Sequence, residues 1–285
     1  MKIKNAPRSS LLYAKRAFLW NSDSSPFLSG DLFAKSSDMT VFPPRFRNVS
    51  SAKRELAEAQ VIFCPSHKVE DFLSLYGKSV TAKVLILGNS DRDFHAPIPE
   101  LSASIKKVLC QNLLFEDPRY QVMPIGLENL RLAKNGMRNL FDPKYFFELK
   151  QNKVLFGPFS RTHSERDEVL NSKVNHSQIV EYIGRMSPVE YARLSSSFKY
   201  IAAPRGNGMD THRFWETLYR GGIPIVKKSL WSKQIAALGI PLIEIDSWDR
   251  KDILKRLDET SILNTNRELP QLWWPWWEKF IRDLI

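Results

Sequence analysis

The sequence predicts an α/β fold built on parallel sheets, and three observations lead to this prediction. Short apolar runs, such as residues 61–65 and 83–88, alternate with stretches of helical length. The runs are apolar throughout, which is typical of strands buried on both faces. Polar residues follow one run directly at 89–93, where a parallel strand would meet a cleft. A chain of 285 residues is long enough for one large domain or two small ones.

The first half of the chain carries the first set of alternating elements. Residues 1–55, rich in Ser, Pro, Phe and Arg, are expected to be irregular. After them we predict a short helix at 70–77 and strands at 61–65, 83–88, 105–110 and 121–125. The alternation breaks in a charged stretch around 142–152. We therefore place a domain boundary near residue 150, with a first domain at 1–150.

A second alternating set begins with a strand at 153–157 and defines a second domain, residues 151–265. Its other strands are predicted at 179–183, 200–203, 223–226 and 241–245, and its helices at 164–170, 187–194, 212–220, from 231, and at 249–257. Ser187, Pro188 and Glu190 form the pattern of a capping box at one helix start. No internal repeat is visible in the sequence.

The segment 199–226 holds the most informative pattern: strand, glycine-containing loop, helix, tight turn, strand. Residues 204–208, Pro-Arg-Gly-Asn-Gly, are expected to form a loop. Asp210 or Thr211 is expected to cap the helix that follows. Two glycines, at 221 and 222, end that helix before the next strand.

This loop has the composition of an anion site. It directs backbone N–H groups, a helix N-terminus and the side chains of Arg205, His212 and Arg213 toward one place. Such a place suits a phosphate or diphosphate. Glu216 lies one turn into the helix, where its carboxylate can accept hydrogen bonds from two ribose hydroxyls.

The charge of the chain indicates an anionic partner. The formal net charge is +11, and the candidate partners are a nucleotide diphosphate, an acidic glycan, an anionic membrane surface and nucleic acid. A merely basic surface is the plain alternative. Basic residues are dispersed along the chain, and no zinc, homeodomain or RNA-recognition pattern is present, so we expect no nucleic-acid partner.

Cys64 and Cys110 each lie in an apolar run and are expected to be buried free thiols, as in a reducing compartment. No Cys/His spacing suggests zinc. Neither a signal peptide nor a transmembrane span is recognisable in the sequence. These features predict a cytoplasmic protein, with contact to a membrane surface left open.

The tail, residues 266–285, holds four of the eight tryptophans. At helical spacing, Trp276, Phe280 and Leu284 share one face, with Trp277 and Ile281 beside them. Two interpretations are open: an interfacial membrane helix, or a terminal helix that crosses back and packs on the first domain. We favour the second, because only two basic residues flank the apolar face.

Residues 204–216 and 221–226 together resemble the donor-binding motif of exostosin-like glycosyltransferases, within the GT-B superfamily. Residues 155–166 resemble the first strand and loop of the donor domain in that family, and 121–129 resemble the segment before its domain linker. The chain departs from the family at Gly222, where the family often has cysteine, and in its short length.

The resemblance implies two Rossmann-like domains that face each other across a cleft. The first would bind a glycan or lipid-linked acceptor, and the second a nucleotide-diphosphate sugar; a C-terminal helix would cross back. Transfer would be inverting and would need neither a cofactor nor a metal, because helix dipoles and basic side chains take up the charge of the leaving group. The setting implied is bacterial surface polysaccharide synthesis at the inner face of the membrane.

The resemblance also implies the roles of individual residues. The donor-binding residues expected from it are Arg205, Gly206, Asn207, Gly208, Thr211, His212, Arg213, Glu216, Arg161 and Arg166. Plain alternatives stay open: an Arg205 paired with an Asp, an Arg213 in an internal ion pair, and a Glu216 that braces the loop. A histidine at a helix N-terminus has its cationic form disfavoured, so His212 can serve as a hydrogen-bond donor or cap.

The general base of an inverting transferase would come from the first domain. Asp91 is our first choice because it follows a buried strand directly, and Asp93, His95 and Glu128 stay open. Two other classes of function are also open. One is a GT-B relative without transfer, such as a sugar-nucleotide epimerase or hydrolase. The other is a basic nucleic-acid-binding module.

Overall fold

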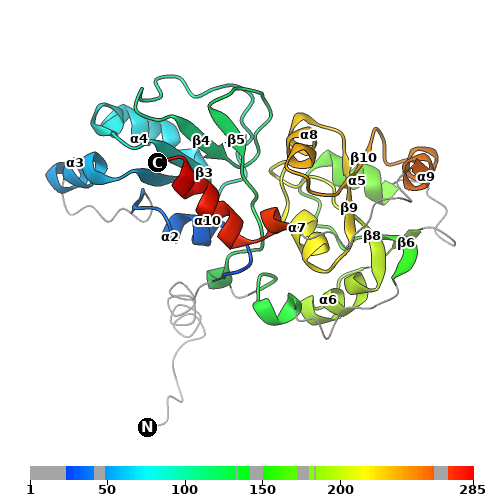
Figure 1. Cartoon of the computed structure of the whole chain (residues 1–285). Helices are drawn as coiled ribbons and strands as arrows, with labels where there is room; N and C mark the ends of the chain where they lie inside the picture. Colours follow the sequence, from blue (N-terminus) through cyan, green and yellow to red (C-terminus); the bar gives the residue numbers. More distant parts are fainter. Residues whose placement is uncertain are drawn as a thin grey trace, which may run out of the picture.

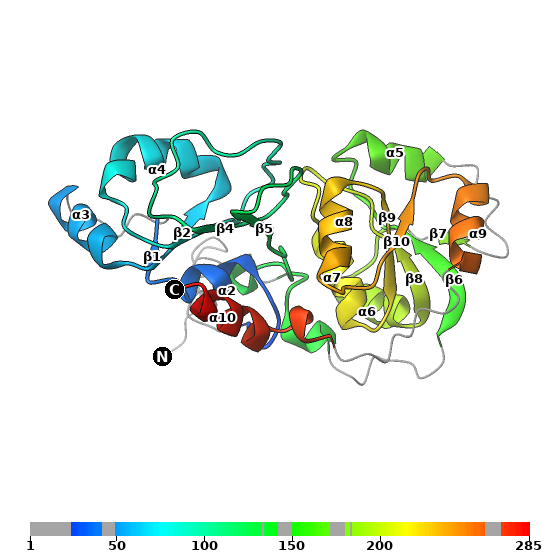
Figure 2. The same ribbon diagram turned by 45° about the horizontal axis from the view of Figure 1, so that its top comes forward.

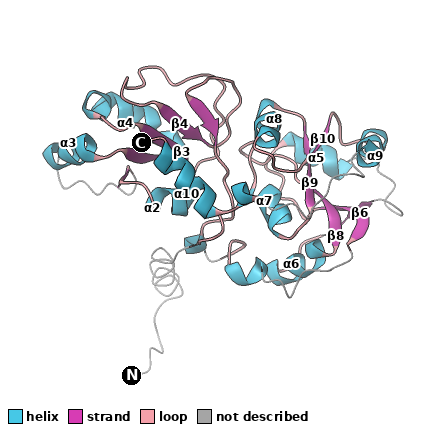
Figure 3. Cartoon of the chain, in the orientation of Figure 1, coloured by secondary structure: helices cyan, strands magenta, loops and turns pink. Residues whose placement is uncertain are grey.

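The computed structural model describes residues 24–41, 49–132, 134–141, 150–171, 180–182, 184–259 and 269–285. Within them, two five-stranded sheets form two lobes that lie side by side (Figure 1). Every strand pair in both sheets is parallel. Helices lie around the strands of each lobe (Figure 3). The predicted α/β fold with parallel sheets is therefore confirmed.

The first sheet has the strand order β1-β2-β3-β4-β5. Its strands are β1 (Met39–Thr40), β2 (Val61–Pro65), β3 (Val84–Gly88), β4 (Lys107–Cys110) and β5 (Tyr120–Val122). Helices α3 (Val49–Glu58) and α4 (Val69–Tyr76) lie on one side of this sheet and α2 (Gly30–Lys35) on the other (Figure 2). Alternate residues of β2 point to opposite faces: Ile62 packs with Phe72 of α4, and Phe63 packs with Phe33 of α2.

The second sheet has the strand order β10-β9-β8-β6-β7. Its strands are β6 (Gln151–Phe156), β7 (Val180–Tyr182), β8 (Phe198–Ala202), β9 (Ile223–Lys227) and β10 (Ile243–Ile245). Its helices are α5 (Ser164–Asn171), α6 (Pro188–Ser196), α7 (His212–Tyr219), α8 (Leu230–Ala237) and α9 (Arg250–Glu259). Ile225 packs toward Ile253 of α9, whereas its neighbour Val226 belongs to the cluster that holds Phe214 of α7.

Helix α10 (Trp274–Asp283) returns from the second lobe and packs on the face of the first sheet that α2 also covers (Figure 1). Trp274 and Trp277 lie edge-on to Phe33, with ring centroids 5.2 and 5.8 Å apart. The most buried face is therefore Trp274, Trp277 and Ile281. This corrects the predicted face, since Trp276, Phe280 and Leu284 are only partly buried at its border.

The prediction for residues 1–55 is wrong in part, because α2 and the start of α3 fall inside that range. Ser29 caps α2 by accepting a hydrogen bond from the backbone N–H of Leu32. Residues 1–23 and 42–48 of the predicted irregular region lie outside the described residues. The capping box of Ser187 and Glu190 is confirmed at the start of α6, and both cysteines are buried and free.

The two lobes share contacts near the point where the chain crosses between them. The hydroxyl of Tyr219 accepts a hydrogen bond from the backbone N–H of Leu28 (3.0 Å) and donates one to the carbonyl of Leu272 (2.6 Å). The last strand of the first sheet ends at Val122, and the first strand of the second sheet begins at Gln151. The division into domains at 1–150, 151–265 and 266–285 stays a prediction.

Candidate active site

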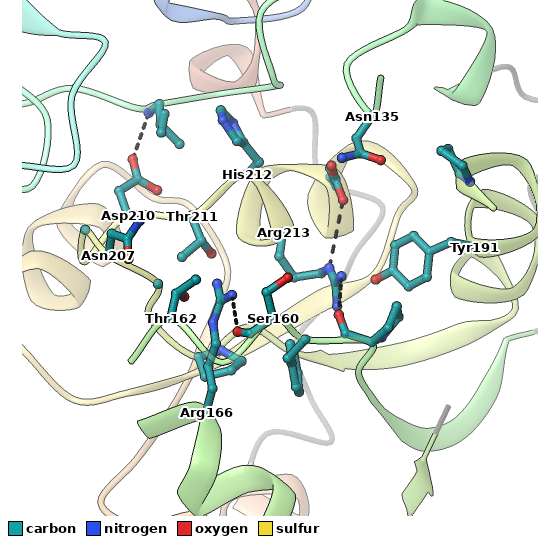
Figure 4. Close-up of a pocket in the computed structure, with 18 of the residues that line it drawn as sticks. Asn135, Ser160, Thr162, Arg166, Tyr191, Asn207, Asp210, Thr211, His212 and Arg213 are labelled. Atoms are coloured by element: carbon teal, nitrogen blue, oxygen red, sulfur yellow. Dashed lines mark hydrogen bonds and ion pairs between the residues drawn. The ribbon is translucent and has the colours of Figure 1, made fainter. Parts of the chain in front are cut away.

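A cavity of about 670 Å³ opens at the carboxyl ends of the strands, between the two lobes. Its floor is the β8–α7 loop and the first turns of α7, and Figure 4 shows how these side chains converge. Open α/β sheets bind ligands at this edge. Its charged lining side chains are Asp91, Arg161, Arg166, Arg185, Asp210, Arg213, Glu216 and Arg220.

The glycines of the β8–α7 loop make room for neighbouring side chains. A Cβ on Gly206 would stand 2.9 Å from Nη2 of Arg166, and one on Gly208 would stand 2.8 Å from Nδ2 of Asn112. At both glycines the backbone therefore approaches other side chains of the protein closely. Both glycines also line the cavity.

Side chains of the first lobe hold this loop. Asp93 pairs with Arg205 (Nη2 to Oδ2, 2.6 Å) and accepts a second hydrogen bond from the backbone N–H of Met209 (3.1 Å). Asn207 donates to Asp91 (3.1 Å). Arg205 is thus engaged in the ion pair that the plain interpretation expected, and it is not among the residues that line the cavity.

Asp210 does not cap α7. Its carboxylate accepts from the backbone N–H of Ile125 and from Nε1 of Trp215, both at 2.7 Å. Burial raises the pKa of Asp210 to about 7, against these two hydrogen bonds. Thr211 stands at the N-cap position without a side-chain capping bond. Its buried Oγ1 has no hydrogen-bond partner among the described residues.

Glu216 lies in the cavity wall between two guanidinium groups. Its carboxylate is 3.9 Å from Nε of Arg213 and 3.7 Å from Nη1 of Arg220, which is longer than a hydrogen bond. Both guanidiniums lie over the ring of Tyr191, at 4.4 and 5.5 Å from its centroid. Arg213 also donates to two backbone carbonyls, of Gly157 and Pro158.

Arg220 is the residue of this group that sequence reasoning missed. Its side chain is 3% exposed, and burial lowers its pKa. Its Nε and Nη1 have no hydrogen-bond partner within the described part of the chain. The i, i+4 spacing from Glu216 along α7 was the signal that could have revealed it. Arg185 and Tyr191 were missed too, and no local pattern marks them.

Arg161, between β6 and α5, and Arg166, in α5, also line the cavity. Arg166 donates to the carbonyls of Arg205 (2.9 Å) and Ser160 (3.0 Å). Burial, and then the charge of Arg213, lowers the pKa of Arg166. Arg161 is 71% exposed and lies 3.4 Å from Asp167. The structure therefore brings both to the cavity, Arg166 as a fixed group and Arg161 as an exposed one.

Of the four candidate bases, Asp91 lines the cavity. Asp93 is paired with Arg205, and Glu128 accepts a hydrogen bond from the backbone N–H of Asn135 (2.8 Å). His95 is exposed and does not belong to the lining residues.

Over the described ranges, no group of three or more His, Cys, Asp or Glu side chains is arranged to hold a metal ion. No helix in the part of the chain that the structure describes is long and apolar enough to cross a membrane.

No protein-family model and no curated protein match the chain. Among the solved structures that match is AviGT4, described as a glycosyltransferase involved in avilamycin A biosynthesis. The match covers 79% of this chain and 83% of that one, at 10% identity and a TM-score of 0.37. A likeness this distant leaves the function to be argued from the site.

Proposed function

We propose that this protein is a glycosyltransferase that moves a sugar from a nucleotide-diphosphate sugar to a glycan or glycolipid acceptor. One observation carries the proposal: Glu216 lies between Arg213 and Arg220 in the wall of a cavity that five arginines and only three carboxylates line. Such an excess of positive charge suits a diphosphate, and a carboxylate beside it suits ribose hydroxyls.

The donor would lie along α7. In this arrangement Glu216 accepts hydrogen bonds from the ribose, and Arg166, Arg213 and the N-terminus of α7 face the diphosphate. The bond between the anomeric carbon and the phosphate oxygen breaks, and the leaving diphosphate gains negative charge. The fixed positive groups stabilise that charge, so the proposed transfer needs no metal and no cofactor.

The acceptor would enter from the first lobe. Its hydroxyl oxygen attacks the anomeric carbon from the face opposite the phosphate, which inverts the configuration there. The hydroxyl proton passes to the carboxylate of Asp91, the candidate base that lines the cavity. Because the hydrogen bond from Asn207 already orients this carboxylate, the base is held in place before the acceptor arrives.

The proposed setting is bacterial surface polysaccharide synthesis in the cytoplasm, with an acceptor at the membrane surface. The tail would offer Trp273 and the partly buried Trp276 and Phe280 for that contact, since Trp277 is buried against the first sheet. Assignment to the exostosin-like family and to the two-domain GT-B arrangement belongs to this proposal as well.

A thermal-shift screen tests the donor site. The purified protein is heated with UDP, GDP, CMP, ADP and their common sugars, with and without EDTA. A nucleotide at one hundred times its dissociation constant is expected to add about 2.7 kcal/mol to the free energy of unfolding. A shift with one nucleotide family, unchanged by EDTA, supports the proposal. No shift across the whole panel contradicts it.

An epimerase or hydrolase would share this site, because it too binds a sugar nucleotide. Product analysis of the donor without any acceptor separates the two classes. If the sugar is released or isomerised without an acceptor as fast as the reaction with acceptor proceeds, the protein is a hydrolase or epimerase and the proposed transfer is wrong.

A further inference from the structure

The side chain of His212 reaches across the cleft. His212 is the first residue of α7, and its Nδ1 lies 2.8 Å from the carbonyl oxygen of Gly126 in the first lobe. The ring points away from Arg166, toward the segment that carries this carbonyl (Figure 4). His212 also lines the cavity and is half-buried.

The contact with Gly126 determines which ring nitrogen carries the proton. A carbonyl oxygen only accepts, so Nδ1 must be the donor. The carbonyl is fixed, because Gly126 has φ +65° and pairs with Ser29 in an isolated bridge. A Cβ at Gly126 would lie 2.2 Å from the carbonyl oxygen of Leu28. The acceptor for Nδ1 is therefore a rigid backbone group that no other residue type reproduces.

The hydrogen on Nδ1 decides what the other ring nitrogen can do. A neutral ring with hydrogen on Nδ1 has a lone pair and no hydrogen on Nε2. Within the described residues, Nδ1 makes the hydrogen bond of this ring and Nε2 is left for a ligand.

A nitrogen without hydrogen cannot donate to a phosphate oxygen, which only accepts. The expected role of His212 as a phosphate ligand therefore conflicts with its tautomer. Nε2 can accept from a hydroxyl, and a sugar is the part of a sugar nucleotide that offers several. We propose that Nε2 of His212 accepts a hydrogen bond from a carbohydrate hydroxyl in this cavity, and this rests on the proposed function.

That hydroxyl has two possible sources: the transferred sugar and the attacking acceptor. Two variants of His212 separate them. His212→Asn keeps an N–H near the position of Nδ1, so the bond to Gly126 survives while the Nε2 acceptor is lost. His212→Gln is the matched control, since its amide reaches the position of Nε2 and loses the bond to Gly126. Calorimetry gives affinities for the nucleoside diphosphate and its sugar form, and steady-state transfer gives kcat.

With a hydroxyl of the transferred sugar, His212→Asn binds the sugar nucleotide about tenfold more weakly and the nucleoside diphosphate as before. With the hydroxyl of the acceptor, both affinities stay unchanged and kcat falls about tenfold. In both cases His212→Gln recovers part of the loss. An equal loss for the diphosphate and its sugar form, or no change in any of these quantities, would overturn the proposal.

A second measurement is independent of any nucleotide. Nitrogen-15 NMR of the wild-type protein distinguishes a protonated ring nitrogen from a bare one. Hydrogen on Nδ1 is expected, and hydrogen on Nε2 would overturn the assignment even if nucleotides bind. A wild-type protein that binds neither diphosphates nor sugar nucleotides would instead refute the proposed function, and the ligand of His212 with it.

Discussion

Two polar clusters lie at the carboxyl ends of the strands, one in each lobe, and they differ in how their side chains are paired. In the first lobe, Asn89 donates to Asp31, Asn129 donates to Asn89, and Arg131 donates to Asp31, at 2.7 to 3.1 Å. In the second lobe, Arg220 and Thr211 keep buried polar atoms without a hydrogen-bond partner among the described residues.

The buried amide of Gln111, after β4, is also unpaired among the described residues, so the second cluster is marked as a candidate binding site by unpaired atoms that lie at the cavity. Buried polar groups are normally paired, because an unpaired one costs about 1–3 kcal/mol. The first cluster meets this requirement with protein atoms alone, and Gly30 makes room for it, since a Cβ there would stand 1.9 Å from Oδ1 of Asn89. In the second cluster, buried polar atoms of Arg220 and Thr211 have no partner among the described residues, and both residues line the cavity. A ligand with hydroxyl and phosphate groups would complete this cluster.

Two of the buried carboxylates, Asp31 and Asp210, give the largest expected effect. Asp31 is paired with an arginine, whereas Asp210 has neutral donors. Burial raises the pKa of Asp210 to about 7, so the folded chain holds a proton that the unfolded chain has released. Its contribution to stability is present below about pH 4 and is lost as pH rises through 7. The change is at most about 4 kcal/mol.

Urea unfolding of the wild type and of Asp210→Asn between pH 4 and 8 measures this effect. The difference between the two free energies of unfolding is expected to vary with pH mainly between 4 and 7. Asp31→Asn serves as the control, and its difference from the wild type is expected to vary less. A constant difference for Asp210→Asn would show that its carboxylate is ionised throughout this range.

Removal of Asp31 tests whether the first cluster is structural. Asp31→Ala removes the carboxylate that accepts hydrogen bonds from Asn89 and from the 36% exposed Arg131, and the loss of these bonds is expected to cost about 2–3 kcal/mol. Nucleotide affinity is expected to stay within a factor of two, because Asp31 does not line the cavity. Denaturant unfolding and calorimetry measure both. Loss of affinity without loss of stability would make this cluster a binding site as well.

Glu216→Gln tests the second cluster. The amide keeps the size of the side chain and removes the charge, so sugar-nucleotide affinity is expected to fall about thirtyfold, or about 2 kcal/mol. Alanine is the poorer choice, because it would also remove the buried volume of the side chain and leave a cavity beside Arg213 and Arg220. Calorimetry decides between the interpretations: an unchanged dissociation constant would leave Glu216 with a bracing role alone.

The smallest expected effect is at Arg220. Arg220→Met is expected to weaken nucleotide binding about tenfold while the free energy of unfolding changes by less than about 1 kcal/mol. The guanidinium carries a desolvation cost that its unpaired nitrogens do not recover in the free protein. Arg220→Lys is the control that keeps the charge. A strongly destabilised Met variant with normal affinity would identify Arg220 as a structural residue.

Local patterns predicted the strands well. The apolar runs at β2, β3 and β9 are buried over almost their whole length, so composition alone marks them. The capping box at Ser187 is a local hydrogen-bond pattern and was readable for the same reason. Helix α2 has only six residues, too few to show a helical period, and it was missed.

The site was harder to predict because its decisive partners lie far apart in sequence. Asp93 reaches Arg205 across 112 positions and Gly126 reaches His212 across 86. The loop sequence indicated which side chains would gather near an anion. It did not indicate that the carbonyl of Gly126 would accept a hydrogen bond from Nδ1 of His212. In the tail, two overlapping helical faces contain tryptophan, and only the packing against Phe33 distinguishes them.

The return of α10 to the first lobe also constrains how the protein is made. The core beside Phe33 and Phe63 includes Trp274, Trp277 and Ile281, which leave the ribosome about two hundred residues after the strands they cover. The first lobe is synthesised first, but its apolar face is fully covered only when α10 has been synthesised after the second lobe. During that interval the part of this face that α2 does not cover stays exposed to other chains. While the protein is being synthesised, this exposed apolar surface can aggregate with other chains until α10 packs against it.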